Sequence, residues 1–167
     1  DFCLSRGLGD VYKRQDVIIV AIDDYSLSQL GRWPWSRSLH ADLINKLNKA
    51  KPRAIGLDVI LSEAEPPQTD GSHPGDKKLV AALEQSARVV LPVVMTNAGR
   101  GLTVGLPIPE FAHAAGALGH INLEHDSDGV VRSVFLNEGQ NDKVWPHFSA
   151  ALLLSLIHIS EPTRQAE

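Results

Sequence analysis

Residues 16–61 read DVIIVAIDDYSLSQLGRWPWSRSLHADLINKLNKAKPRAIGLDVIL, and this stretch decides the fold class. Its first part, residues 16–22, is a continuous apolar and β-branched run, which predicts a strand buried on both faces. After the N-cap residue Ser36, apolar residues recur at helical spacing until Pro52 closes the helix. Residues 53–61 are a second apolar run. Strand, helix and strand in this order predict a right-handed parallel crossover unit.

The middle of the chain predicts another helix and another strand. Asp76 is expected to cap a helix that carries Leu79 and Leu83 on one side. Residues 88–95, RVVLPVVM, are apolar and β-branched and predict a third strand. Pro92 within this run indicates a sheet edge or a bulge, because proline cannot donate to a strand ladder.

The C-terminal half predicts antiparallel strands and a last helix. Residues 117–124 and 130–136 flank a turn at Asp128-Gly129, which is a strong hairpin signal. A final helix is expected to begin near Pro146. We therefore expect a single α/β domain that has a mixed parallel and antiparallel sheet with helices packed on its faces.

The composition bounds the classes of function. A chain of 167 residues suits one domain, and its net charge of -4 argues against a nucleic acid as the partner. No run of about 18 or more apolar residues occurs, so no segment of this sequence is expected to cross a bilayer. The motifs GxSxG, GxxxxGK and GxGxxG are absent, which removes the commonest enzyme classes for an α/β chain.

Both ends of the chain differ in pattern from the rest. Residues 1–15 and 156–167 resemble translated sequencing-adapter read-through, and we expect them to be non-native; the alternative is ordinary disordered termini. The native segment is then residues 16–155, truncated at both ends. The only cysteine, Cys3, lies in the N-terminal string, so we expect no disulfide and no thiolate metal site in the native segment.

Three blocks of the sequence carry a family resemblance. They read VIIVAIDDYSLSQLGRWPWSRSLHADLINKL, RAIGLDVILSE and GALGHINLEHDSDGVVRSVFL. In this order they resemble the second CHASE-type family, the extracellular sensory domains associated with cyclases and histidine kinases. The resemblance covers nearly all of residues 16–155. It implies a domain that is not itself an enzyme.

The same resemblance implies a place in a larger protein. The domain would be the periplasmic or extracellular part of an inner-membrane receptor, with membrane helices on both sides and a cytoplasmic output module beyond them. We expect a small-molecule ligand of unknown identity, no cofactor, and a homodimer in the full receptor.

Four acidic side chains are expected to meet beyond the strand ends. Asp23 and Asp24 follow the first predicted strand, and Asp58 and Glu63 lie at or past the second. Ligands of open α/β sheets bind outside the carboxyl ends of parallel strands, so adjacent strands would bring these carboxylates together. Such a group suits a polar ligand or a divalent cation. The alternative is that the aspartates cap the next helix or bond nearby backbone amides.

The segment GRWPWSR is expected to form the rim of this cleft. Arg32 and Arg37 carry forked donors, and Trp33 and Trp35 carry flat apolar area, so together they can clamp an anionic or aromatic ligand. The alternative is that the tryptophans pack at the edge of the domain and the arginines pair with the acids.

Two later residues, His120 and Asn122, are weaker candidates for the same cleft. His120 and His125 are five positions apart, which places them on opposite faces of a strand and argues against a shared metal ion. The HDSDG segment lacks the later glutamate of a calcium loop, and the hairpin turn explains it fully. We therefore assign no metal site and no catalytic residue.

Two other functions stay open. The sequence AIDDYS places an aspartate where the nucleophile of a metal-dependent hydrolase would follow a first strand, with Asp23, Asp24 and Asp58 as its acids. No second set of a lysine and an acid stands out at later strand ends, which argues against a hydrolase. The other alternative is a scaffold that dimerises and binds no ligand.

Overall fold

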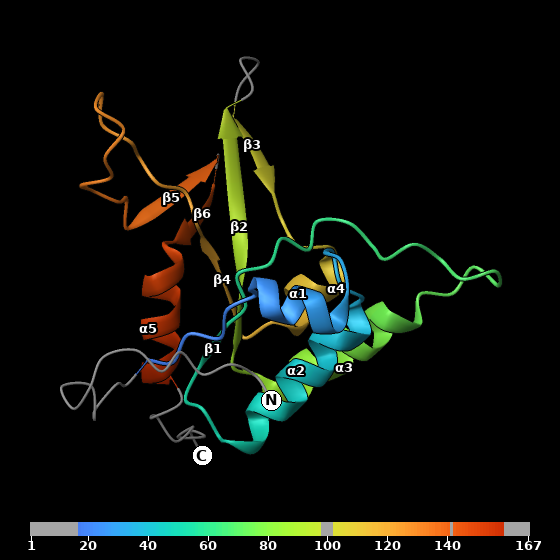
Figure 1. Cartoon of the computed structure of the whole chain (residues 1–167). Coiled ribbons are helices and arrows are strands. Elements are labelled where there is room, and N and C mark those ends of the chain that lie inside the picture. Colours follow the sequence, from blue (N-terminus) through green and yellow to red (C-terminus); the bar gives the residue numbers. More distant parts are fainter. Residues whose placement is uncertain (1–16, 98–101, 141, 159–167) are drawn as a thin grey trace. The chain divides into compact units, whose positions relative to one another are not determined.

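The computed structural model describes residues 17–97, 102–140 and 142–158, and it divides the chain into two compact units, Asp1–Trp35 and Ser36–Glu167 (Figure 1). The described part of the first unit contains the helix α1 (Asp24–Leu30). The second unit contains, in chain order, α2 (Arg37–Lys49), β1 (Ile55–Gly56), α3 (Pro74–Ser86), β2 (Val89–Asn97), β3 (Leu102–Gly105), α4 (Pro109–Ala114), β4 (Ala117–His120), β5 (Asn137–Gln140), β6 (Lys143–Pro146) and α5 (Phe148–His158).

The sheet of the second unit is built around β2. This strand pairs in parallel with β1, where Ile55 lies opposite Val89, and in parallel with β4. It pairs antiparallel with β3, where Val94 lies opposite Gly105. A separate antiparallel hairpin is formed by β5 and β6. The predicted α/β fold with a mixed sheet is therefore confirmed.

The main core lies between one face of this sheet and helices α2, α3 and α4. Side chains alternate between buried and exposed along residues 55–61, and the buried ones face the helices. The largest fully buried apolar members of this core include Ile44, Leu61, Leu79, Leu83, Leu91 and Phe111. As the sequence predicts, the apolar residues of α2 and α3 form one stripe on each helix, and this stripe is buried against the sheet.

Helix α5 packs on the sheet where small residues admit it, and Figure 1 shows it across β2 from α2 and α3. A Cβ added at Gly56 would lie 3.0 Å from the side chain of Leu152. A Cβ added at Gly119 would lie 2.7 Å from the Cα of Phe148. Gly56 alternates with core residues along its strand, so α5 covers the face opposite to α2 and α3.

The predicted first strand is not present as a strand. Residues 17–23 belong to no helix and no strand, and Val17, Ile18 and Ile19 are 73, 70 and 80% exposed. A strand is defined by hydrogen bonds to a neighbouring strand. The described part of the first unit contains no strand with which residues 17–22 could pair. An apolar β-branched run therefore indicates that a segment can form a strand, but the strand forms only where a neighbouring strand pairs with it.

The inference from Pro92 was wrong, because β2 is the central strand and not an edge. Backbone groups of alternate residues face opposite neighbours: Val90 accepts from Leu57 of the β1 segment, whereas Val89 and Val93 accept from the β4 side. Pro92 therefore faces the side of β1 and β3. Pairing with β1 ends at Val90 and pairing with β3 begins at Val94, so the missing N–H of proline falls between two partners.

Other elements differ from the predictions in their limits. Only Ile55–Gly56 of the second predicted strand pairs as a strand. Helix α3 begins at Pro74 with His73 in the N-cap position, so Asp76 is not its cap. Helix α5 begins at Phe148, just after the predicted start near Pro146.

The predicted HDSDG turn is present, although it closes a loop and not a strand ladder. The amide of Gly129 donates to the carbonyl of Asp126, and Gly129 adopts a φ of 78°. Glu124 and Ser133 form an isolated antiparallel bridge beyond the turn. The sequence analysis missed the β5–β6 hairpin that follows, although the polar residues between Leu136 and Val144 were a turn signal.

Candidate functional site

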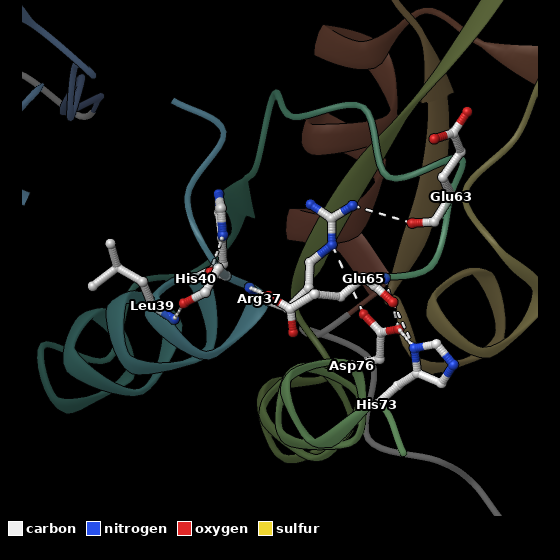
Figure 2. Close-up of polar contacts among 8 residues, drawn as sticks. Arg37, Leu39, His40, Glu63, Glu65, His73 and Asp76 are labelled. Atoms are coloured by element: carbon white, nitrogen blue, oxygen red, sulfur yellow. Dashed lines mark hydrogen bonds and ion pairs between the residues drawn. The ribbon is translucent and has the colours of Figure 1, made fainter. Parts of the chain in front are cut away.

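Polar side chains gather where α2 and α3 begin, and we call Arg37, Glu65, His73 and Asp76 the Arg37 cluster (Figure 2). Ser36 caps α2, since its hydroxyl accepts from the amide of Leu39, and this cap makes Arg37 the first helical residue. The loop after β1 brings Glu65 and His73 to the same place. The cluster therefore lies past the carboxyl end of β1, where α/β sheets bind ligands.

The Arg37 cluster joins the loop to both helices. The backbone amide of Arg37 donates to Oε1 of Glu65 at 3.0 Å, and its Nη2 donates to the carbonyl of Glu63 at 3.1 Å. The amide of Glu65 in turn donates to Oδ2 of Asp76 at 3.0 Å. Nδ1 of His73 is hydrogen-bonded to the carbonyl of Glu65. These bonds tie the loop after β1 to the first turns of α2 and α3.

An ion pair between Arg37 and Asp76 lies inside the cluster. Nε of Arg37 lies 3.8 Å from Oδ1 of Asp76, and both side chains are largely buried, at 14 and 10% exposed. Nδ1 of His73 lies 3.8 Å from the other oxygen of the same carboxylate. A buried carboxylate of this kind depends on its cationic partner. Arg37, one of the two arginines of the predicted rim, is therefore engaged by the protein, but its partner Asp76 is not among the acids predicted to pair with it.

The two acids predicted on the second strand are both exposed. Asp58 alternates with the buried residues Leu57 and Val59, so its side chain lies on the sheet face opposite to the main core. Glu63 contributes its backbone carbonyl to Arg37, and its carboxylate points away from the cluster (Figure 2). Both residues follow β1 in the chain, and both carboxylates are exposed.

The acids of the first unit lie at the start of α1. Oδ1 of Asp23 accepts from the amide of Ser26 at 2.8 Å, and the Ser26 hydroxyl accepts from the amide of Asp23. The hydrogen bond from the Ser26 amide holds the pKa of Asp23 below its usual value. Asp24 is the first, exposed residue of the helix. Asp23 therefore caps a helix, as the alternative reading expected.

The aromatic residues of the predicted rim pack against each other. The rings of Trp33 and Trp35 are 5.6 Å apart and meet edge to face at 64°. Nε1 of Trp35 donates to the carbonyl of Gly31 at 2.9 Å, while Arg32 is exposed. Asp23, Asp24, Arg32, Trp33 and Trp35 belong to the first unit, and Arg37, Asp58, Glu63, His120 and Asn122 to the second. Their meeting in one cleft stays a prediction.

The side chain of Asn122 makes the hydrogen bonds that the backbone of a neighbouring strand would make. Its Oδ1 accepts from the amide of Met95 at 3.0 Å, and its Nδ2 donates to the carbonyl of Met95 at 2.9 Å. The side chain thus continues, past the end of β4, the pairing of β4 with β2. Both ends of its amide are engaged by the protein backbone.

Replacing Asn122 by alanine is expected to lower the free energy of unfolding by roughly 1–3 kcal/mol, because both backbone groups of Met95 lose a partner. Urea denaturation measures this change. The exposed Asn137 serves as the control, and Asn137→Ala is expected to change stability by less than about 0.5 kcal/mol. Equal effects of the two substitutions would show that the Asn122 amide does not stabilise the sheet.

His120 lies inside the second unit and not on an open cleft. Its side chain is fully buried on β4, and its Nδ1 is 3.3 Å from Oε2 of Glu138 on β5. The acids of the predicted turn, Asp126 and Asp128, are both paired with Arg132 at 2.7 and 2.8 Å. The hydrogen bond from Arg132 lowers the pKa of Asp128. Both aspartates therefore stabilise the turn.

Sequence reasoning missed the partners that complete these clusters. Glu65, Glu138 and His147 stood in no recognisable motif, and Asp76 was interpreted only as a helix cap. Arg37 and Asp76 are far apart in the chain, so no local pattern joins them. Among the described residues, no group of three or more histidine, cysteine, aspartate or glutamate side chains could hold a metal ion. No helix in the same part of the chain is long and apolar enough to span a membrane.

Comparison with known proteins identifies a family. The family model of the CHASE2 domain matches residues 2–165. No curated protein and no solved structure matches the chain. CHASE2 domains are sensory domains associated with signalling receptors; they are typically extracellular, and they are not catalytic. Because the match covers nearly the whole sequence, this chain belongs to the CHASE2 family of sensory domains.

Proposed function

We propose that this domain is the extracytoplasmic, ligand-sensing input domain of a bacterial transmembrane receptor, with a cytoplasmic output such as a histidine kinase, a nucleotide cyclase or a protein kinase. The family supplies the sensory role. The observation that supports ligand binding is that Asp58 and Glu63, which both follow β1, keep exposed carboxylates. The ligand we propose is a small polar molecule with hydrogen-bond donors, or a cation.

The Arg37 cluster supports this proposal because it holds the loop after β1 in one conformation. The cluster fixes the loop at Glu63 and Glu65 through hydrogen bonds from Arg37. A binding loop held in one conformation loses less conformational entropy when a ligand arrives. Glu63 would therefore present its carboxylate from a preorganised loop.

Calorimetry tests ligand binding. The 167-residue chain would be titrated with Mg²⁺, Ca²⁺, polyamines, amino acids and sugars, and at least one of these classes is expected to bind. Asp58→Asn is expected to weaken that binding by about tenfold to a hundredfold, since a hydrogen bond to a charged group contributes about 1.5–3 kcal/mol. The control Glu84→Gln, on the exposed side of α3, is expected to leave binding unchanged. Binding that survives Asp58→Asn and Glu63→Gln would place the ligand elsewhere.

The parent gene tests the receptor context. We expect membrane-spanning segments on both sides of the domain in the complete reading frame and a signalling output after them. Alkaline phosphatase fused in place of the domain is expected to be active, because that enzyme matures outside the cytoplasm. A wholly cytosolic parent protein would contradict the proposed location.

A second candidate function, a ligand-free dimerisation scaffold, is favoured by α5. Leu153 and Leu154 of this apolar helix are 59 and 46% exposed, and exposed leucines of this kind suit a second copy of the chain. Analytical ultracentrifugation together with the ligand screen separates the two functions: dimerisation with no ligand favours the scaffold. The hydrolase alternative gains no support, since Asp23 is engaged as a helix cap.

A further inference from the structure

A buried ionisable cluster lies where β4, the β5–β6 hairpin and the start of α5 meet in the second unit. We call it the His120 cluster, and it consists of His120 on β4, Glu138 on β5, and His147 between β6 and α5. His120 is fully buried, and its Nδ1 is 3.3 Å from Oε2 of Glu138. The rings of His120 and His147 are 5.1 Å apart and meet edge to face. The backbones of these two histidines also form a parallel bridge.

The hydrogen bonding of this cluster is incomplete. Among the described residues, the ring nitrogens of His120 and Oε2 of Glu138 make no hydrogen bond of good geometry, although Nδ1 lies 3.3 Å from that oxygen and the Phe135 carbonyl also interacts with the ring. Buried polar atoms are normally paired, and a native exception calls for a functional explanation. A proton added to the His120 ring would change both the charge and the hydrogen bonding of this site at once.

Burial and the groups that face the ring together determine the protonation of His120. From β5 comes the Glu138 carboxylate, and from the start of α5 comes His147. The neighbouring strand β2 contains no ionisable side chain, and none occurs in residues 148–156 of α5. Burial lowers the pKa of His120 below its ordinary value of 6.5, and the charge of His147 lowers it further, while Glu138 and the Phe135 carbonyl act in the opposite direction.

The cluster also holds the start of α5. Nδ1 of His147 pairs with the hydroxyl of Ser149 at 2.8 Å and lies 3.4 Å from the Ser149 amide, in the first turn of that helix. At the same point β4 and α5 are in close contact, because a Cβ at Gly119 would meet the Cα of Phe148. A change at His120 therefore reaches α5 through His147 and through the β4 backbone.

We propose that the His120 cluster makes this domain respond to protons: protonation of His120 opens the junction between β4, the β5–β6 hairpin and the start of α5. A charged imidazolium in this buried place needs water, and it repels a second charge on His147. Admitting water separates the hairpin from β4 and frees the first turn of α5. The use of this response as a signal rests on the proposed sensory function, whereas the response itself is a property of the chain.

The direction of the pH dependence follows from the lowered pKa. The unfolded chain binds a proton at this histidine more readily than the folded chain. This contribution to stability is complete above a pH of about 6.5 and is lost as the pH falls towards the pKa of the folded state. The junction is therefore expected to be closed at neutral pH and to open on acidification.

Tryptophan fluorescence tests the proposal directly. Trp145 on β6 lies opposite Glu138 in the hairpin, and Trp33→Phe together with Trp35→Phe leaves it as the only tryptophan. In this background, Trp145 emission is expected to change with a midpoint below pH 6.5. His120→Gln is expected to abolish the transition, and the control His113→Gln, at an exposed histidine on α4, to leave it unchanged.

Two further variants keep the test decisive if His120→Gln does not fold. Glu138→Gln is expected to move the midpoint to lower pH, because it removes the charge that favours protonation. His147→Asn, which can still accept from the first turn of α5, is expected to move the midpoint to higher pH. A transition that persists in His120→Gln, no transition in the parent chain, or equal shifts in these two variants would overturn the proposal. None of these outcomes depends on the ligand screen or on the location of the receptor.

Discussion

Asp76→Ala is expected to lower the free energy of unfolding by about 3–5 kcal/mol, because it leaves the Arg37 guanidinium buried without its carboxylate. The substitution also removes the acceptor of the Glu65 amide, so the loop after β1 loses its link to α3. Urea denaturation monitored by circular dichroism measures the change. Ligand affinity at the proposed site of Asp58 and Glu63 is expected to fall together with stability, because the same loop carries Glu63.

The same two helices provide a matched control. Asp42 on α2 and Lys78 on α3 form an ion pair of 2.8 Å, but their side chains are 59 and 46% exposed. Exposed pairs contribute about 0–1 kcal/mol, so Asp42→Ala is expected to have a small effect. If Asp42→Ala and Asp76→Ala cost the same, burial of the Arg37–Asp76 pair does not determine its contribution.

Gly119→Ala is expected to lower the free energy of unfolding by about 2–3 kcal/mol. The added Cβ would lie 2.7 Å from the Cα of Phe148 and 3.0 Å from the Cβ of Ala151, so β4 and α5 must move apart. The first of these neighbours is a backbone atom, which cannot turn aside as a side chain can. Loss of this contact is also expected to change the environment of His120, which nuclear magnetic resonance of the imidazole protons would detect.

Gly105→Ala is the control for this substitution. A Cβ at Gly105 on β3 would have its nearest neighbour at 3.6 Å, which is an ordinary contact. Alanine in a strand is otherwise better than glycine by roughly 0.5–1 kcal/mol, so Gly105→Ala is expected to be neutral or slightly stabilising. A neutral Gly119→Ala would mean that α5 is not held closely against β4.

The elements that depend on local pattern could be predicted from the sequence. Ser36 and the leucines that follow it define α2, and the β-branched run of residues 88–95 defines most of β2. Each of these signals lies within a few residues of the element that it predicts. The family resemblance came from the order of three such blocks, and the CHASE2 match confirms it.

The parts that depend on distant partners could not be predicted. Residues 17–22 have the composition of a strand, but pairing is decided by a neighbour that the run itself does not specify. Arg37 was assigned to the rim of a cleft, whereas Asp76 engages it from the start of α3. Glu138 and His147 belong to a hairpin and a helix start that the sequence analysis did not foresee, so the His120 cluster was not predicted.

The position of Pro92 has a consequence for self-association. Between its contacts with β1 and β3, the only backbone groups that β2 turns to that side belong to Pro92, which offers a carbonyl and no N–H. An incoming strand from another molecule needs alternating donors and acceptors to add itself to a sheet. This stretch offers an incoming strand one acceptor and no donor, so the break between β1 and β3 is not a template for intermolecular strand addition.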